Sequence, residues 1–102
     1  MRLRDEEKAL TARVALGAAF LDRFKPTWYQ DVDTDSLSMP HGDYCLLGQV
    51  AHTFYDPKRF GLTERASHAL GFELPDTIQD LRRELTPTWN QAAVYEVESR
   101  RH

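Results

Sequence analysis

The sequence has 102 residues, of which 41% are hydrophobic and 11% aromatic, and this composition fits one globular domain, residues 1–102. Its formal net charge of −3 argues against a general binder of polyanions, which usually carries an excess of basic residues. A single cysteine excludes an intramolecular disulfide and with it a secreted disulfide scaffold. The first residues, MRLRDEEKAL, lack the apolar core of a signal peptide, and no run is apolar enough to span a bilayer. We therefore expect a cytoplasmic protein with no membrane contact.

The first predicted helix covers about residues 5–24. Its apolar residues recur at spacings of four and three, which is typical of one buried face of an α-helix. They are Leu10, Val14, Gly17, Leu21 and Phe24. Pro26 ends the helix, because the residue before a proline avoids the helical backbone conformation.

An acidic and aromatic segment follows, with the sequence TWYQDVDTDSLSMPHG. Its large rings, Trp28 and Tyr29, either pack over the end of the first helix or line a binding surface. No lysine or arginine occurs between Lys25 and Lys58, whereas five aspartates do. They are Asp31, Asp33, Asp35, Asp43 and Asp56. The middle of the chain is therefore predicted to present an ordered acidic loop.

The second predicted helix runs from about Asp43, a good N-cap residue, to Phe54. Gly48 lies inside it, where glycine costs about 1 kcal/mol relative to alanine. A close neighbouring backbone would explain this glycine. We expect the first helix to approach it through Gly17 or the adjacent alanines.

A third, short helix is predicted after Thr63, whose hydroxyl suits an N-cap. Gly71 ends this helix, since glycine readily adopts the left-handed conformation at a helix C-terminus. Phe72 and Leu74 are then expected to fold back onto the core.

The last helical region begins at Asp76. Thr86-Pro87 is expected to interrupt it and to begin a final helix that extends to about Arg100, because proline fits the first turn of a helix and disrupts its interior. The expected buried face consists of Trp89, Ala93 and Val97. With no convincing pair of strands, the predicted fold is all-α, a small single-domain bundle of four to five helices.

A calcium loop is suggested by the spacing of Asp31, Asp33 and Asp35, which matches the first, third and fifth places of an EF-hand. The pattern then fails. Ser36 stands where the sharp turn needs glycine, and Gly42 stands where a bidentate glutamate is needed.

A zinc site is the other metal hypothesis, with His41, Cys45 and His52 as ligands. These residues lack the tight local spacing of zinc ligands, so no metal and no cofactor is predicted. The sequence also contains no GxSxG, HExxH or CxxC motif. The chain is therefore expected to be non-enzymatic, with a metal-dependent enzyme as an alternative.

DNA binding is a further alternative, because ERASHALGFELPDTIQDLRREL resembles a helix, a glycine-containing turn and a second helix. The side chains expected to face the DNA groove are Thr77, Gln79, Arg82 and Arg83. Against this, Ser67 replaces the expected small alanine and Pro75 lengthens the turn. The acidic balance is also unfavourable, since phosphate contacts supply most of the affinity for DNA.

The ordered set WYQDVDTDSLSM, CLLGQV, HALGFEL and RRELTPTW resembles a family of small uncharacterised proteins common in actinobacterial bacteriophages and their hosts. The resemblance covers most of the chain from Gly17 to Trp89. It implies an origin and no particular activity. Members of the family often carry a second cysteine three residues before the position of Cys45, where this chain has Gly42.

Several residues of these motifs are interpreted as structural. They are Cys45, Gly48, Gln49, Gly71 and Trp89. In particular, we expect the Gln49 side chain to hydrogen-bond the backbone of the 28–37 loop, since a buried amide needs partners. That contact would fix the acidic loop against the second helix.

The leading hypothesis is a small phage-type protein that binds a host or phage protein through an acidic and aromatic surface. The residues of this surface are Trp28, Tyr29, Asp31, Asp33, Asp35 and Asp43. A solvated acidic stretch beside large aromatic rings motivates it, because exposed aromatics are enriched at interfaces. The sequence does not determine the oligomeric state.

Overall fold

The computed structural model describes residues 2–52 and 57–101, and over this part of the chain the secondary structure is entirely helical. The elements in chain order are α1 (Arg2–Phe24), the 3₁₀ helix η1 (Trp28–Asp31), α2 (Leu46–Ala51), the 3₁₀ helix η2 (Pro57–Phe60), α3 (Glu64–Ala69), the 3₁₀ helix η3 (Asp76–Leu81) and α4 (Arg82–Arg100). The predicted all-α class is confirmed. Within these described ranges, no helix has the length and apolar character needed to cross a bilayer.

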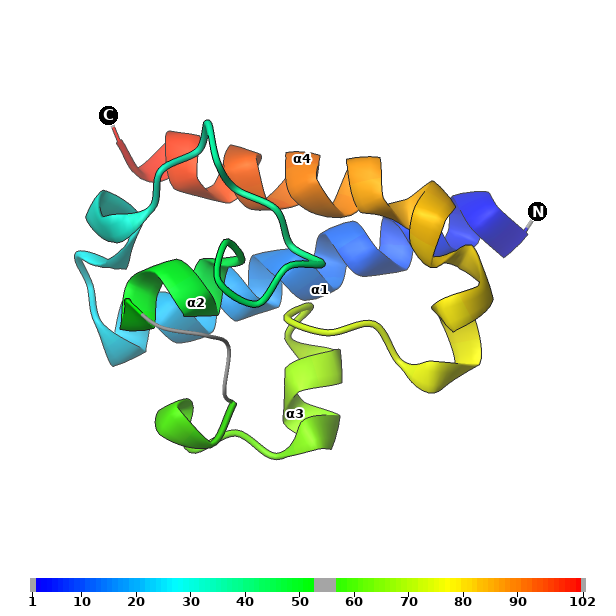
Figure 1. The fold of residues 1–102 in the computed structure, drawn as a ribbon, viewed down its shortest axis with the longest axis horizontal. Helices are drawn as coiled ribbons and strands as arrows, with labels where there is room; N and C mark the ends of the chain where they lie inside the picture. Colours follow the sequence, from blue (N-terminus) through cyan, green and yellow to red (C-terminus); the bar gives the residue numbers. More distant parts are fainter. Residues whose placement is uncertain (1, 53–56, 102) are drawn as a thin grey trace.

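The two long helices, α1 and α4, lie side by side and run in the same direction (Figure 1). Their facing side chains form the centre of the core, and the largest of them is Trp89, which is 1% exposed. The predicted apolar stripe of α1 is buried from Leu10 to Leu21, as is the predicted face of α4. Phe24 is the exception. It is 50% exposed and packs its ring on that of Phe60, with 4.9 Å between the ring centroids.

Two glycines allow the end of α3 to pack directly against the backbone of α1. A Cβ atom on Gly17 would lie 2.1 Å from the carbonyl oxygen of Leu70, and one on Gly71 would lie 2.6 Å from the backbone nitrogen of Val14. Gly71 also has a φ of +73°, so it ends α3 as predicted. The predicted cap is confirmed too, since the Thr63 hydroxyl accepts a hydrogen bond from the backbone N–H of Ala66.

The predicted interruption at Thr86-Pro87 is wrong, because α4 begins at Arg82 and continues through the proline. Proline in a helix interior costs about 3 kcal/mol. Here it lies in the second turn, and the side chains on either side of it, Leu85 and Trp89, are buried. Burial of such side chains contributes about 1.5–3 kcal/mol each, which offsets the cost.

The second helix is shorter than predicted and begins later. Cys45, not Asp43, is its N-cap, and the Cys45 sulfur accepts a hydrogen bond from the backbone N–H of Gly48. The predicted end at Phe54 lies outside the described residues. Gly48 does permit a close approach, but its neighbour is the turn before α2 and not α1: a Cβ there would lie 2.0 Å from the carbonyl oxygen of Gly42.

Candidate functional site

Four aspartates from the end of η1 to the turn before α2 form what we call the acidic surface. They are Asp31, Asp33, Asp35 and Asp43. Asp31 and Asp43 line a hollow of about 270 Å³ together with Gly48, Gln49 and His52. The last three aspartates of the surface are exposed, and Asp31 is half-buried.

The Gln49 side chain holds the backbone of the acidic loop. Its Oε1 accepts a hydrogen bond from the N–H of Asp33 at 2.6 Å, and its Nε2 donates to the carbonyl oxygen of Asp33 at 3.3 Å. Nε2 also donates to the carbonyl oxygen of Tyr44 at 2.9 Å. The predicted role of Gln49 in tying the loop to the second helix is therefore confirmed.

Helix α4 holds the same loop from the other side. The Asn90 Oδ1 accepts from the backbone N–H of Met39 at 2.7 Å, and Arg82 donates to the carbonyl oxygen of Pro40 at 3.1 Å. Arg101, which directly follows α4, donates to the carbonyl oxygen of Val32. The loop is thus fixed at several points along its length, and this confirms its predicted order.

The carboxylates of the acidic surface differ in what they contact. Asp31 forms an ion pair with Lys25 at 2.6 Å. Asp33 closes a local turn, because its Oδ1 accepts from the N–H of Asp35 and its Oδ2 from the Ser36 hydroxyl. Within residues 2–52 and 57–101, the carboxylates of Asp35 and Asp43 take part in no ion pair. These two are therefore the charges most available to a partner.

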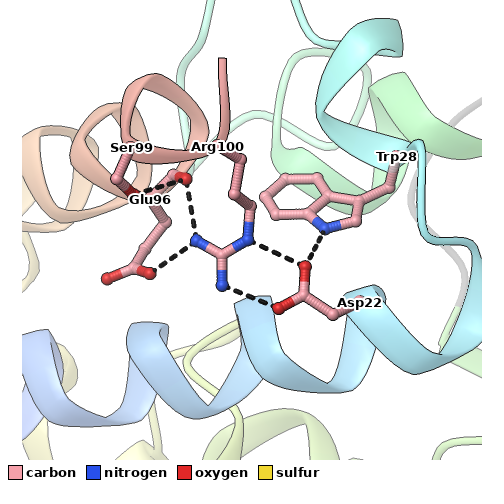
Figure 2. Close-up of polar contacts among 5 residues, drawn as sticks. All are labelled: Asp22, Trp28, Glu96, Ser99 and Arg100. Atoms are coloured by element: carbon pink, nitrogen blue, oxygen red, sulfur yellow. Dashed lines mark hydrogen bonds and ion pairs between the residues drawn. The ribbon is translucent and has the colours of Figure 1, made fainter. Parts of the chain in front are cut away.

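The sequence hypothesis is wrong about Trp28, which has no exposed surface. Its indole Nε1 donates to the Asp22 carboxylate at 2.9 Å, and its ring lies 5.5 Å from the Arg100 guanidinium carbon (Figure 2). Tyr29 is half-buried and packs edge-on against Trp28. An exposed aromatic beside the aspartates is instead supplied by Tyr44, 52% exposed, which was not predicted because it was expected inside the second helix.

The polar cluster beneath Trp28 shifts the pKa values of its charged groups. Hydrogen bonds from Arg100 lower the pKa of the Asp22 carboxyl, and the bond from Trp28 adds to this effect against an opposing contribution from burial. The same bonds to Asp22, with a smaller effect of Glu96, raise the pKa of Arg100. Figure 2 shows how the Arg100 guanidinium lies between the two carboxylates. Both ends of this contact stay charged at neutral pH.

The residues weighed as zinc ligands do not come together as a metal site. Cys45 is buried, its thiol donates to the carbonyl oxygen of Gly42 at 3.5 Å, and burial raises its pKa. His41 instead forms a hydrogen bond with the Ser38 hydroxyl at 2.6 Å. Across the described part of the chain, no group of three or more histidine, cysteine, aspartate or glutamate side chains is placed to hold a metal ion.

The segment expected to form a DNA-recognition helix has a different structure. Residues 76–81 are a 3₁₀ helix with a non-helical φ of −124° at Ile78. Gln79 donates to the carbonyl oxygen of Leu74, and Arg82 is directed to the acidic loop. The Arg2 guanidinium donates to the backbone carbonyl oxygen of Thr77, and within the described ranges the side chains of Thr77 and Arg83 have no hydrogen-bond partner. The start of the expected second helix is therefore a 3₁₀ helix, and DNA binding stays a prediction.

A second surface, which sequence reasoning missed, lies between α1 and α3. It is a groove of about 310 Å³, and its lining residues are Leu16, Ala19, Phe20, Arg23, Ala69 and Leu70. Leu16 is 58% exposed, which is unusual for a large hydrophobic side chain of a helix that packs in the core. The sequence does contain an indication of this groove. Leu16 and Phe20 lie outside the predicted buried stripe of the first helix, at positions where polar residues are expected.

Comparison of the chain with protein-family models, curated proteins and solved structures gives no match.

Proposed function

We propose that this chain is a small non-enzymatic binding protein whose acidic surface docks a basic segment of a partner protein. The observation that carries the proposal is the contact of Gln49 with both the N–H and the carbonyl of Asp33, next to exposed carboxylates at Asp35 and Asp43. A loop that is ordered before binding loses less conformational entropy when its partner arrives.

The charge pattern supports a basic partner. The acidic surface has four aspartates and no lysine or arginine between residues 26 and 44, and of the four only Asp31 forms an ion pair with a lysine or arginine in the described ranges. Such a surface steers partners of opposite charge toward it and disfavours nucleic acid. Tyr44 adds an exposed ring that can stack on a lysine or arginine side chain.

The resemblance to small phage proteins suggests the source of the partner. On that basis we propose a host or phage protein that meets this chain in the cytoplasm of an actinobacterial cell. The partner's contact segment is expected to carry lysine or arginine, because the exposed groups that it meets are carboxylates.

A pull-down from an actinobacterial lysate, with and without nuclease, tests the proposal. The double variant Asp35→Lys/Asp43→Lys reverses the two available charges of the acidic surface. Its matched control is Asp5→Lys/Glu84→Lys, which makes the same charge change at exposed positions near the N-termini of α1 and α4. The wild type and the control should retain a nuclease-resistant partner that the first variant loses. Retention by all three proteins, or loss of the partner on nuclease treatment, would contradict the proposal.

A further inference from the structure

The groove between α1 and α3 is an apolar site with a basic rim. Its apolar lining residues include Leu16, Phe20 and Leu70, and one basic residue, Arg23, lines it as well. Arg65 lies one turn before Ala69 on α3 and so projects from the same side of that helix.

The charge around the groove is opposite to that of the acidic loop. Residues 57–71 contain Lys58, Arg59 and Arg65 against one acid, Glu64, which gives a formal charge of +2. Residues 26–44, which hold the acidic surface, contain four aspartates and no lysine or arginine, which gives −4. The chain therefore carries both halves of a complementary pair of surfaces.

The aromatic content of the two surfaces is complementary as well. Tyr44 presents a half-exposed ring beside Asp43, and the groove presents aliphatic and aromatic side chains beside Arg23. Helix α3 lies on one side of α1, whereas α4 and the crest of the acidic loop lie on the other (Figure 1). The crest of the loop is held there by the contacts of Gln49, Asn90 and Arg82 and so lies away from the groove of its own molecule, which makes a second molecule the occupant that we consider.

We propose that the groove binds the acidic surface of a second copy of this chain. The Tyr44 ring of one copy packs on Leu16 and Phe20 of the next, while Asp35 and Asp43 meet the basic rim. This inference rests on the proposed function, since it uses the same acidic surface. It adds that a second copy of the chain and the basic partner compete for that surface. Because the two contacting surfaces differ, the copies join head to tail, which gives a closed ring where the rotation between copies closes and an open chain where it does not.

Sedimentation velocity on the purified protein tests the contact, over a wide range of concentration at low and high salt. The wild type should associate as concentration rises, and salt should weaken the association because charge pairs contribute to it. Two variants, Arg23→Glu/Arg65→Glu and Asp35→Arg/Asp43→Arg, should each weaken it by roughly tenfold or more, since each makes the paired surfaces alike in charge. Circular dichroism establishes that both variants fold.

A mixture of the two variants gives the decisive result. In the mixture, the basic loop of the Asp35→Arg/Asp43→Arg variant meets the acidic groove of the Arg23→Glu/Arg65→Glu variant. The native acidic loop of the second variant likewise meets the native basic groove of the first. The mixture should therefore associate, although neither variant associates alone. A wild type that stays monomeric at low salt, or a mixture that stays monomeric, overturns the inference. So does association that is lost in the groove variant but kept in the loop variant, because that pattern indicates groove-to-groove pairing.

The outcome for self-association is separable from that for the proposed function. If the purified protein is monomeric while the lysate partner is still lost from the Asp35→Lys/Asp43→Lys variant, the inference fails and the proposed function stands. If the protein self-associates but captures no nuclease-resistant partner that depends on the acidic surface, the proposed function fails and the inference stands.

Discussion

Arg100 holds both oxygens of the Asp22 carboxylate, with its Nε and Nη2 each 2.8 Å from one of them. This bidentate contact joins the last turn of α4 to the last turns of α1, at the point where the chain leaves α1 for the acidic loop (Figures 1 and 2). The Trp28 indole donates to the same carboxylate. The contact therefore sets the position from which the acidic loop starts.

Replacing Asp22 with asparagine should lower the free energy of unfolding by about 1–2 kcal/mol. The change removes a charge-assisted pair and leaves the half-buried Arg100 guanidinium without its main carboxylate. Urea denaturation measures the effect. The control is Asp80→Asn, which removes the ion pair with Arg2, whose two side chains are 55% and 62% exposed. That control should cost less than about 0.5 kcal/mol, and equal losses in the two variants would contradict the prediction.

The same carboxylate should make stability depend on pH in the acid range. Because the folded pKa of Asp22 is lowered, its contribution is fully present above the unfolded value of about 3.9 and is lost as pH falls through the folded pKa. Urea denaturation at a series of acidic pH values should therefore give a steeper fall in stability for the wild type than for Asp22→Asn. Parallel pH profiles would show that Asp22 is not linked to folding.

Gln49→Leu should lower the melting temperature. The substitution removes the hydrogen bonds to Asp33 and Tyr44, and a loss of about 1–2 kcal/mol is expected because backbone groups of the loop lose their partner. Such a loss corresponds to roughly 4 °C or more in a domain of this size. Gln91→Leu, at an exposed position of α4, is the matched control and should change little. A melting temperature for Gln49→Leu equal to or above that of the wild type would show that these hydrogen bonds do not stabilise the loop.

Alanine substitutions at two glycines separate backbone strain from crowding. Gly61 and Gly71 both have positive φ, 70° and 73°, but nothing lies within 4 Å of a Cβ on Gly61, whereas one on Gly71 would meet the backbone of α1 at Val14. Gly61→Ala should cost about 1 kcal/mol from strain alone. Gly71→Ala should cost at least about 2 kcal/mol more, since α1 and α3 would have to separate. Thermal denaturation measures the loss of stability in each variant. Similar losses in the two variants would contradict the prediction, because they would mean that α3 can move away from α1 at little cost.

The sequence was informative wherever one local rule decided the structure. The spacing in α1, the Thr63 cap and the stop at Gly71 each follow from nearby residues, and all three predictions are confirmed. The all-α class follows from several such segments together. Gln49 was also predictable, because a polar amide beside an apolar stripe needs a partner, and the adjacent acidic loop offered backbone groups.

The errors arose where tertiary contacts override local preference. Pro87 would normally begin a helix, but burial of Leu85 and Trp89 extends α4 across it. Asp43 is the better N-cap by preference, yet the turn at Gly42 passes so close to Gly48 that the helix begins after Cys45. The burial of Trp28 depends on Asp22 and Arg100, which are 78 residues apart in the sequence, and no local pattern reports that pairing.

The parallel arrangement of α1 and α4 also affects how the chain reaches its native state. Antiparallel helical neighbours joined by a short connection fold quickly, because their contacts close small loops. Here two contacts join residues that are 78 positions apart in the sequence, Arg2 with Asp80 and Asp22 with Arg100. Most of the chain must therefore close into a loop before the two long helices can stabilise each other. Although every regular element is helical in the described ranges, the domain has a non-local topology, and its folding rate should fall below that of an up-and-down bundle of equal length.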